Sequence, residues 1–393
     1  MDTARKRQGE DELPREAMTS EERILAAVRL EQPDRVPVDA LLTIEPLAHL
    51  IGTLPGPLYR DFNLLLEALL RVYDDCPFDI FEAPIPASYE CYLLGGGLEF
   101  KSPGREFPDN QVIQVVEREV LKREDYAKIA EMGWSRFFFE DYRYRVSPPI
   151  KQEDVPRIQN AIDQYASKCV REWEKRGVRV LVGQAPICHH PFFKLSLSRS
   201  LVKFTEDLYY EPTSVEEALR RMTSDMIVDL INGCRVSKTQ IARIEEERAS
   251  GYYYPPKIFE RFWWPYTEQI VRELWSRGIV TLFHLDTPWD RNINYFRRLP
   301  KGSAIIRLDG TTDILAAKQT LGGHLCLMGD VHPAMLSLSN KAEVEAYCRK
   351  LISQVGRDGG FILSTGCCVP PNVKPENFRA MIQTAKNYLP SGV

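Results

Sequence analysis

Short apolar segments rich in β-branched residues alternate with amphipathic segments through the second half of the 393-residue chain. The expected strands occupy residues 177–186, 239–247, 278–286, 303–310, 324–333 and 359–368. The expected helices around them occupy residues 154–176, 198–210, 214–232, 256–277, 342–355 and 375–388. Alternation of this kind builds a parallel sheet, and roughly eight such units in this length favour a closed (β/α)8 TIM barrel over an open sheet.

The first part of the chain is less regular. Residues 1–17 mix charges of both signs without an apolar run, so we interpret them as a flexible tail and not as a signal peptide. A capped helix start follows this tail, and an amphipathic segment covers Phe62–Cys76, which together predict an N-terminal helical extension. A short strand is expected at 78–81 and hairpin strands at 111–120. We therefore expect one barrel domain over residues 18–393.

The overall charge and the cysteines limit the class of partner and the compartment. A formal net charge of −4 and a pI of about 6.0 argue against nucleic acid as the main partner. No apolar run reaches the length of a transmembrane helix. The nine cysteines are scattered without a C-x-x-C pair, which is typical of a reducing compartment. We expect a cytoplasmic protein that binds neither nucleic acid nor a membrane, and a homodimer is left open.

The segment Phe361–Pro371, FILSTGCCVPP, differs from the other expected strands. It begins with apolar residues, turns abruptly to small and polar ones, and delivers Cys367 and Cys368 before two prolines end the element. A strand that ends on Gly-Cys fills a core poorly. It is well suited to present a ligand or a nucleophile at the mouth of a barrel. Of the two thiols we assign the ligand role to Cys367, because the side chain of Cys368 should point away from it.

Most expected strands of the second half end on residues that can bind a metal or exchange a proton. These are Glu245, Glu247, His284, Asp286, Asp309, Asp330, His332 and Cys367. In a barrel the carboxyl ends of the strands converge on one face, which is where such barrels carry out their chemistry. The sequence therefore predicts a functional site at that face.

His284 and Asp286 are two residues apart in an expected strand, so their side chains face the same side. With Cys367 across the barrel mouth they would form a three-ligand zinc site that keeps an open position for substrate. The alternative is a His-Asp hydrogen bond that only fixes the strand end. Glu245 and Glu247 are candidates for a further ligand, and Glu247 is preferred as a general base. A solvated charged loop is the alternative for this acidic run.

Two other histidine-containing segments invite a functional interpretation. In Cys188-His189-His190 adjacent side chains diverge and cannot all bind one ion, so we interpret His189 and His190 as pocket wall or as proton donors. Asp330-Val331-His332 matches half of the D-x-H-x-x-G motif that binds cobalamin through its histidine. Met335 occupies the glycine position of that motif, which favours a structural role.

Four segments of the sequence are distinctive: MTSEERILAAVRLEQPDRVPV, YYPPKIFERFWWPYTEQIVRELWSRGIVTLFHLD, MGDVHP and FILSTGCCVPPNVKPENFRAMIQTAKNY. Together they resemble the uroporphyrinogen decarboxylase superfamily. The resemblance covers nearly the whole chain from about Met18 and implies a (β/α)8 barrel. The R-Q-A-G-R-Y motif with which the decarboxylases bind substrate carboxylates has no counterpart over 39–60. The PDRVPV start and the STGC end look instead like the cobalamin-dependent methyltransferase branch.

This resemblance implies a metal site, since members of that branch hold zinc with an H-x-C motif and a later cysteine. His284 and Cys367 match those positions, and Asp286 stands in place of the usual middle cysteine. A carboxylate makes the site harder and more Lewis-acidic than a second thiolate would, which suits an oxygen ligand. Aromatic residues expected in loops suggest a flat substrate; these are Tyr89, Tyr92, Tyr252, Tyr253, Tyr254 and Trp263.

The expected function is therefore zinc-dependent O-demethylation. A methyl group would pass from a methoxylated, aromatic compound to the cobalt(I) of a corrinoid (cobalamin) carried by a separate protein. Three alternatives stay open: a methylcobalamin:thiol methyltransferase of the coenzyme M type, a metal-free uroporphyrinogen-type decarboxylase, and a binding protein that has kept the barrel without its chemistry.

Overall fold

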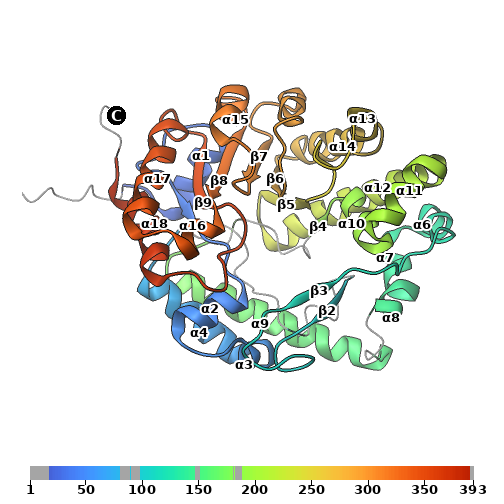
Figure 1. Cartoon of the computed structure of the whole chain (residues 1–393), viewed down its shortest axis with the longest axis horizontal. Helices are drawn as coiled ribbons and strands as arrows, with labels where there is room; N and C mark the ends of the chain where they lie inside the picture. The colour runs from blue at the N-terminus through green and yellow to red at the C-terminus, as the bar shows by residue number, and fades with distance from the viewer. Residues whose placement is uncertain are drawn as a thin grey trace, which may run out of the picture.

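The computed structural model describes residues 17–79, 89, 98–146, 151–179, 181 and 188–389. Seven strands in this part of the chain form one sheet in the order β1-β9-β8-β7-β6-β5-β4, and every neighbouring pair is parallel. The strands are β1 (Val38–Asp39), β4 (Cys188–His189), β5 (Ile241–Glu246), β6 (Val280–Leu285), β7 (Ala304–Leu308), β8 (Cys326–Val331) and β9 (Phe361–Thr365). Helices cover the outer face of this curved sheet (Figure 1), which confirms the (β/α)8 barrel. The strands expected at 78–81 and 177–186 fall largely outside the described residues.

The helices alternate with the strands as the sequence predicts. They are α1 (Ser20–Val28), α2 (Ile44–Ile51), α3 (Pro55–Arg60), α4 (Phe62–Asp75), α6 (Asp125–Met132), α7 (Trp134–Phe137), α8 (Arg143–Val146), α9 (Val155–Lys175), α10 (Pro191–Arg199), α11 (Leu201–Tyr210), α12 (Pro212–Ser237), α13 (Pro256–Phe262), α14 (Trp264–Trp275), α15 (Ile314–Leu321), α16 (Pro333–Leu338), α17 (Lys341–Gln354) and α18 (Pro375–Asn387). The single helix expected over 256–277 is wrong. Pro265 lies in the first turn of α14, where a proline starts a helix instead of continuing one.

Side chains on the two faces of the sheet belong to two different cores. The outward-facing residues, such as Ile244 and Phe283, pack against the surrounding helices. The inward-facing residues in the first half of the strands, such as Ile241 and Val280, form a second apolar cluster inside the barrel. Helix α1 supplies Ile24, Ala27 and Val28 to this inner cluster. The N-terminal end of the barrel is therefore filled with apolar side chains and closed by α1.

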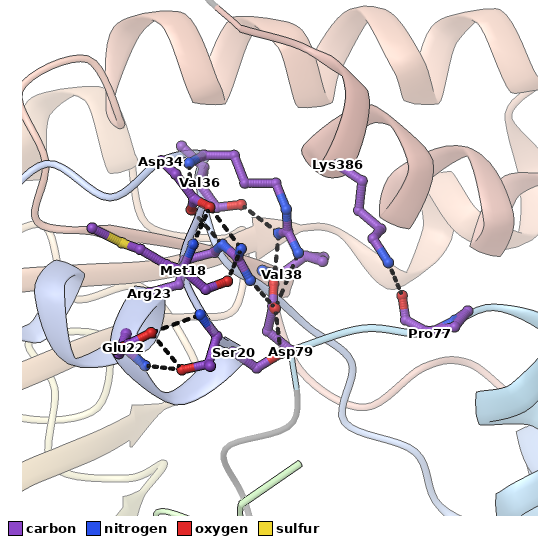
Figure 2. A network of polar contacts seen from close by, with 12 residues as sticks. Met18, Ser20, Glu22, Arg23, Asp34, Val36, Val38, Pro77, Asp79 and Lys386 are labelled. Atoms are coloured by element: carbon purple, nitrogen blue, oxygen red, sulfur yellow. Dashed lines mark hydrogen bonds and ion pairs between the residues drawn. The ribbon is translucent and has the colours of Figure 1, made fainter. Parts of the chain in front are cut away.

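A buried ion network holds α1 in place (Figure 2). The guanidinium of Arg23, which is fully buried, bonds Asp34 at 2.6 Å and Asp79 at 2.9 Å. The same Asp79 carboxylate accepts a hydrogen bond from Arg35 Nη1 at 2.7 Å and from the Val38 backbone amide at 3.1 Å. Burial alone would raise the pKa of Asp79, but the charges of Arg35 and Arg23 hold it below its usual range. The network ties α1 to β1 and to the segment that follows α4.

Of the hairpin strands expected over residues 111–120, the described structure has β3 (Gln114–Val116); its antiparallel partner β2 (Glu99–Lys101) lies before that range. Contacts with the rest of the chain flank this hairpin on both sides. The Glu45 carboxylate accepts a hydrogen bond from the Ile113 backbone amide at 3.0 Å, and Arg248 donates to Glu117 at 2.8 Å. Arg248 follows β5, so these contacts bring the hairpin segment alongside the carboxyl ends of the barrel strands.

Candidate functional site

Four polar residues lie side by side across the inner face of the sheet near the carboxyl ends of its strands. The strand register pairs His189 with Glu245, Glu245 with His284, and His284 with Arg307. Ile241, Leu282 and Ile305 lie in the apolar inner cluster, so Glu245, His284 and Arg307 follow them at the two-residue period of inward-facing positions. The inner cluster thus ends on a polar layer.

His284, Asp286 and Cys367 come together above this layer. Each offers one ligand atom, and these three atoms all lie within 4.8 Å of one another. His284 Nε2 is 3.2 Å from Asp286 Oδ1, and Cys367 Sγ donates to Asp286 Oδ2 at 3.5 Å. His284 lies in β6, one residue before its end. Asp286 is the first residue after β6, and Cys367 follows β9. Residues 81 positions apart in the chain therefore share one small polar cluster.

The cluster fits a zinc ion. Ligand atoms around a tetrahedral zinc lie about 3.3–3.8 Å apart, close to the two distances above. Burial alone would lower the pKa of His284, but hydrogen bonds with Asp286 and Cys367 raise it to about 9. The Cys368 thiol and burial both raise the pKa of Cys367. The raised pKa values mean that His284 and Cys367 keep their protons at neutral pH. A divalent ion would displace these protons and bind the same ligand atoms.

Two further carboxylates lie near the cluster. The Glu245 carboxylate accepts a hydrogen bond from Arg243, and Glu245 Oε2 lies 3.3 Å from His189 Nε2. Burial, followed by the negative charges of Asp286 and Glu245, raises the pKa of Glu247 to about 7. Three carboxylates in one half-buried space repel one another, and a divalent cation relieves that repulsion. Both glutamates therefore belong to the candidate site, together with His189.

His190 is not part of this site. Its ring is fully buried on the opposite face of the strand, where Nε2 contacts Thr267 Oγ1 at 3.2 Å and Nδ1 accepts from the Phe192 backbone amide at 3.2 Å. Burial lowers its pKa to about 3. The structure thus places His190, expected as pocket wall or proton donor, away from the site, because His189 faces the barrel interior and its neighbour must face outward.

Other residues singled out from the sequence also lie elsewhere. Asp330 accepts a hydrogen bond from Tyr347 Oη of α17 at 2.7 Å. The preceding residue, Gly329, has φ of 127°, which interrupts the regular alternation of side chains between the two faces of β8. His332 caps α16, accepting from the Ala334 backbone amide at 3.1 Å, which agrees with the structural role favoured above. Trp263 is fully buried and donates to Glu246, so it does not line an open pocket.

The other aromatic residues that the structure describes lie in different surroundings. Tyr254 is buried and contacts Thr205 Oγ1 at 2.9 Å, while Tyr252 is 67% exposed. Tyr89 faces the Arg105 guanidinium, 4.2 Å from its ring centroid. Tyr92 lies outside the described residues. A flat aromatic pocket therefore stays a prediction.

Sequence reasoning missed the arginines of the site. Arg307 is fully buried and bonds Ser364 Oγ at 3.0 Å and Asp39 Oδ2 at 3.4 Å. Arg243 precedes Glu245 by two residues, which is the signal that would have placed it on the inner face. Cys368 follows Cys367 in the bend after β9, where the chain leaves the extended conformation, and the Cys367 thiol lowers the pKa of Cys368.

Comparison with known proteins finds matches of parts of the chain to one family. Residues 195–388 match the family model described as uroporphyrinogen decarboxylase (URO-D). The uroporphyrinogen decarboxylase of Methylococcus capsulatus is 32% identical over 90 residues, 23% of this chain and 25% of that protein. The enzyme of the same name from Coxiella burnetii is 24% identical over 187 residues, 46% and 49% of the two chains. The chain thus spans about half or less of the length of these relatives.

A solved structure described as a methyltransferase from Methanosarcina mazei matches with a TM-score of 0.68 at 18% identity, covering 94% of this chain and 98% of that one. At this identity the match establishes the fold. The second half of the chain thus matches the uroporphyrinogen decarboxylase family, and the chain has the fold of this (β/α)8 methyltransferase structure. Among the described residues, no helix is long and apolar enough to cross a membrane.

Proposed function

We propose that this protein is a zinc-dependent methyltransferase that moves a methyl group from a methoxylated aromatic compound to the cobalt(I) of a corrinoid on a separate protein. The observation that carries the proposal is the convergence of His284, Asp286 and Cys367 at the carboxyl ends of the strands. Three protein ligands with a fourth position left for substrate are typical of catalytic zinc. The overall fold of the methyltransferase from Methanosarcina mazei supports the reaction class.

The chain's own residues account for binding and for proton transfer. A zinc ion held by the cluster would supply Lewis-acid polarisation of the ether oxygen. In the overall reaction the methyl–oxygen bond breaks, a methyl–cobalt bond forms, and the phenolate leaves and takes up a proton. Glu247 and the His189–Glu245 pair are the groups beside the cluster that can exchange that proton. Asp286 in place of a second thiolate favours an oxygen leaving group over a thiol acceptor.

A decarboxylase is the second candidate, because the curated relatives carry that name. Against it, Asp39 on β1 faces Arg307 within the barrel, where Ser364 Oγ also donates to Asp39 Oδ2 at 3.1 Å. The positive charge of Arg307 is therefore matched within the protein. This arrangement leaves little at that position to bind the several carboxylates of a porphyrinogen.

The test is methylation of a corrinoid protein, observed as the absorbance change from cobalt(I) to methyl-cobalt(III) when a methoxyphenol is added. We expect turnover in the wild type, none in Cys367→Ala, and unchanged turnover in Cys348→Ala, whose thiol is buried in α17. Methyl transfer from methylated corrinoid to a thiol, without activity on any methoxyarene, would refute the donor assignment. Release of carbon dioxide from a tetrapyrrole would favour the decarboxylase, and ligand binding without turnover a binding protein.

A further inference from the structure

The residue after Asp286 has an unusual backbone conformation. Thr287 has φ of 72°, in the left-handed region that β-branched residues avoid. Such a conformation is energetically unfavourable and persists only where its surroundings hold it. The strain lies directly beside a candidate metal ligand, so the groups that hold Thr287 also set the direction of Asp286.

Asp309, which follows β7, holds the backbone amide of Thr287. Its Oδ2 accepts from the Thr287 backbone amide at 2.8 Å. Its Oδ1 accepts from the backbone amide of Thr311 at 2.8 Å and from Thr311 Oγ1 at 2.6 Å. Both oxygens are thus engaged in hydrogen bonds that fix the carboxylate. The sequence placed Asp309 among the residues at the barrel mouth without a role, and this geometry supplies one.

Asp309 also contacts the loop that carries Cys367. A Cβ built on Gly366 would lie 2.3 Å from the Asp309 carbonyl oxygen, so the two main chains pack directly against each other. On the other side, Thr287 Oγ1 donates to the Glu247 carbonyl oxygen at 3.1 Å. Asp309 therefore lies between the loops of Asp286 and Cys367, and Thr287 extends this connection to the loop of Glu247.

We propose that Asp309 is a positioning residue that fixes Asp286 and Cys367 relative to each other for metal binding. This inference rests on the metal centre of the proposed function. Groups that orient metal ligands typically contribute 10–100-fold to metal affinity. We therefore expect Asp309→Ala to weaken cobalt(II) binding by about 10–100-fold and to change the visible absorption bands of the bound ion, which report its coordination geometry.

The experiment compares Asp309→Ala and Asp309→Asn with the wild type and with Asp313→Asn. Asparagine keeps one acceptor oxygen and should give an intermediate affinity, which covers the case in which the alanine variant does not fold. Asp313 is in the same loop, and its carboxylate caps α15 through the Leu315 and Ala316 amides, so its variant should bind cobalt like the wild type. Unchanged affinity and spectra in both Asp309 variants would overturn the proposal.

A second readout separates this proposal from the metal centre itself. In metal-free protein labelled with ¹⁵N-histidine, the His284 resonance reports the contact with Asp286, 3.2 Å away. Asp309→Ala should shift this resonance, and Asp313→Asn should not. If the wild type bound no cobalt, the metal centre would be refuted, and the His284 resonance alone would decide the role of Asp309: a shift supports it and an unchanged resonance overturns it.

Discussion

Replacing Asp79 by asparagine should strongly destabilise the protein. Asp79 is the shared partner of two guanidiniums, with side-chain exposures of 2% for Asp79, 0% for Arg23 and 5% for Arg35. The substitution keeps the shape and removes the charge, leaving two buried cations without their common carboxylate. Breaking a buried ion pair from one side costs about 3–5 kcal/mol. An unfolding entropy of about 2.1 cal/mol/K per residue gives about 0.8 kcal/mol/K for 393 residues, so the thermal midpoint should fall by about 5 °C.

The assay is thermal and urea unfolding of the wild type and the variant, monitored by circular dichroism. Asp75→Asn is the matched control, because its ion pair with Arg379 at 2.7 Å is exposed and contributes less than about 1 kcal/mol. Asp79→Asn should also loosen α1, with faster amide exchange at Ile24 and Val28. A free-energy change for Asp79→Asn as small as that for Asp75→Asn would refute the argument that the network anchors α1.

Three further predictions follow from the geometry. Burial alone would raise the pKa of Asp34, but the hydrogen bond from Arg23 lowers it to about 2. The ionised carboxylate therefore stabilises the folded protein fully above about pH 4, and this stabilisation is lost as the pH falls towards 2. The acid unfolding curves of the wild type and of Asp34→Asn should converge near that pH, and parallel curves would contradict the argument. Cys367→Ala should lose zinc by elemental analysis and stay folded, while Cys368→Ala keeps it; the reverse pattern would mean that the ligand is Cys368. Gly366→Ala should lower the free energy of unfolding by about 1–3 kcal/mol and weaken zinc binding, because the added Cβ would lie 2.3 Å from the Asp309 carbonyl oxygen. An unchanged free energy of unfolding and an unchanged zinc content would show that the loop has room for a side chain.

The parts of the fold and site that follow a simple period could be predicted from the sequence. Strand alternation gives the parallel barrel, and the two-residue period places Glu245 and His284 on its inner face. The same period separates His189 from His190, and applying it consistently would have removed His190 from the site. Asp286 and Cys367 come together because the carboxyl ends of parallel strands converge, which needs no knowledge of the loops.

What could not be predicted depends on backbone conformation outside regular elements. The left-handed conformation of Thr287 has no sequence signature, since threonine rarely adopts it. The role of Asp309 follows from that conformation and was therefore hidden. Asp330 bonds Tyr347 of α17, and the buried Trp263 bonds the carboxylate of Glu246; both partners lie at least 17 residues away in the sequence. Each case needed the three-dimensional arrangement of neighbouring chain segments.

The apolar filling of the barrel beneath the polar layer has a kinetic consequence. Among the described residues, α1 and the inner cluster fill the N-terminal end, so that end offers no route to His284 and Cys367. Under the proposed function, we expect the methyl donor and the methyl acceptor to share the entrance at the carboxyl ends of the strands. We expect a compulsory order, in which the donor enters first and the acceptor seals it in, and the demethylated product leaves only after the acceptor has departed.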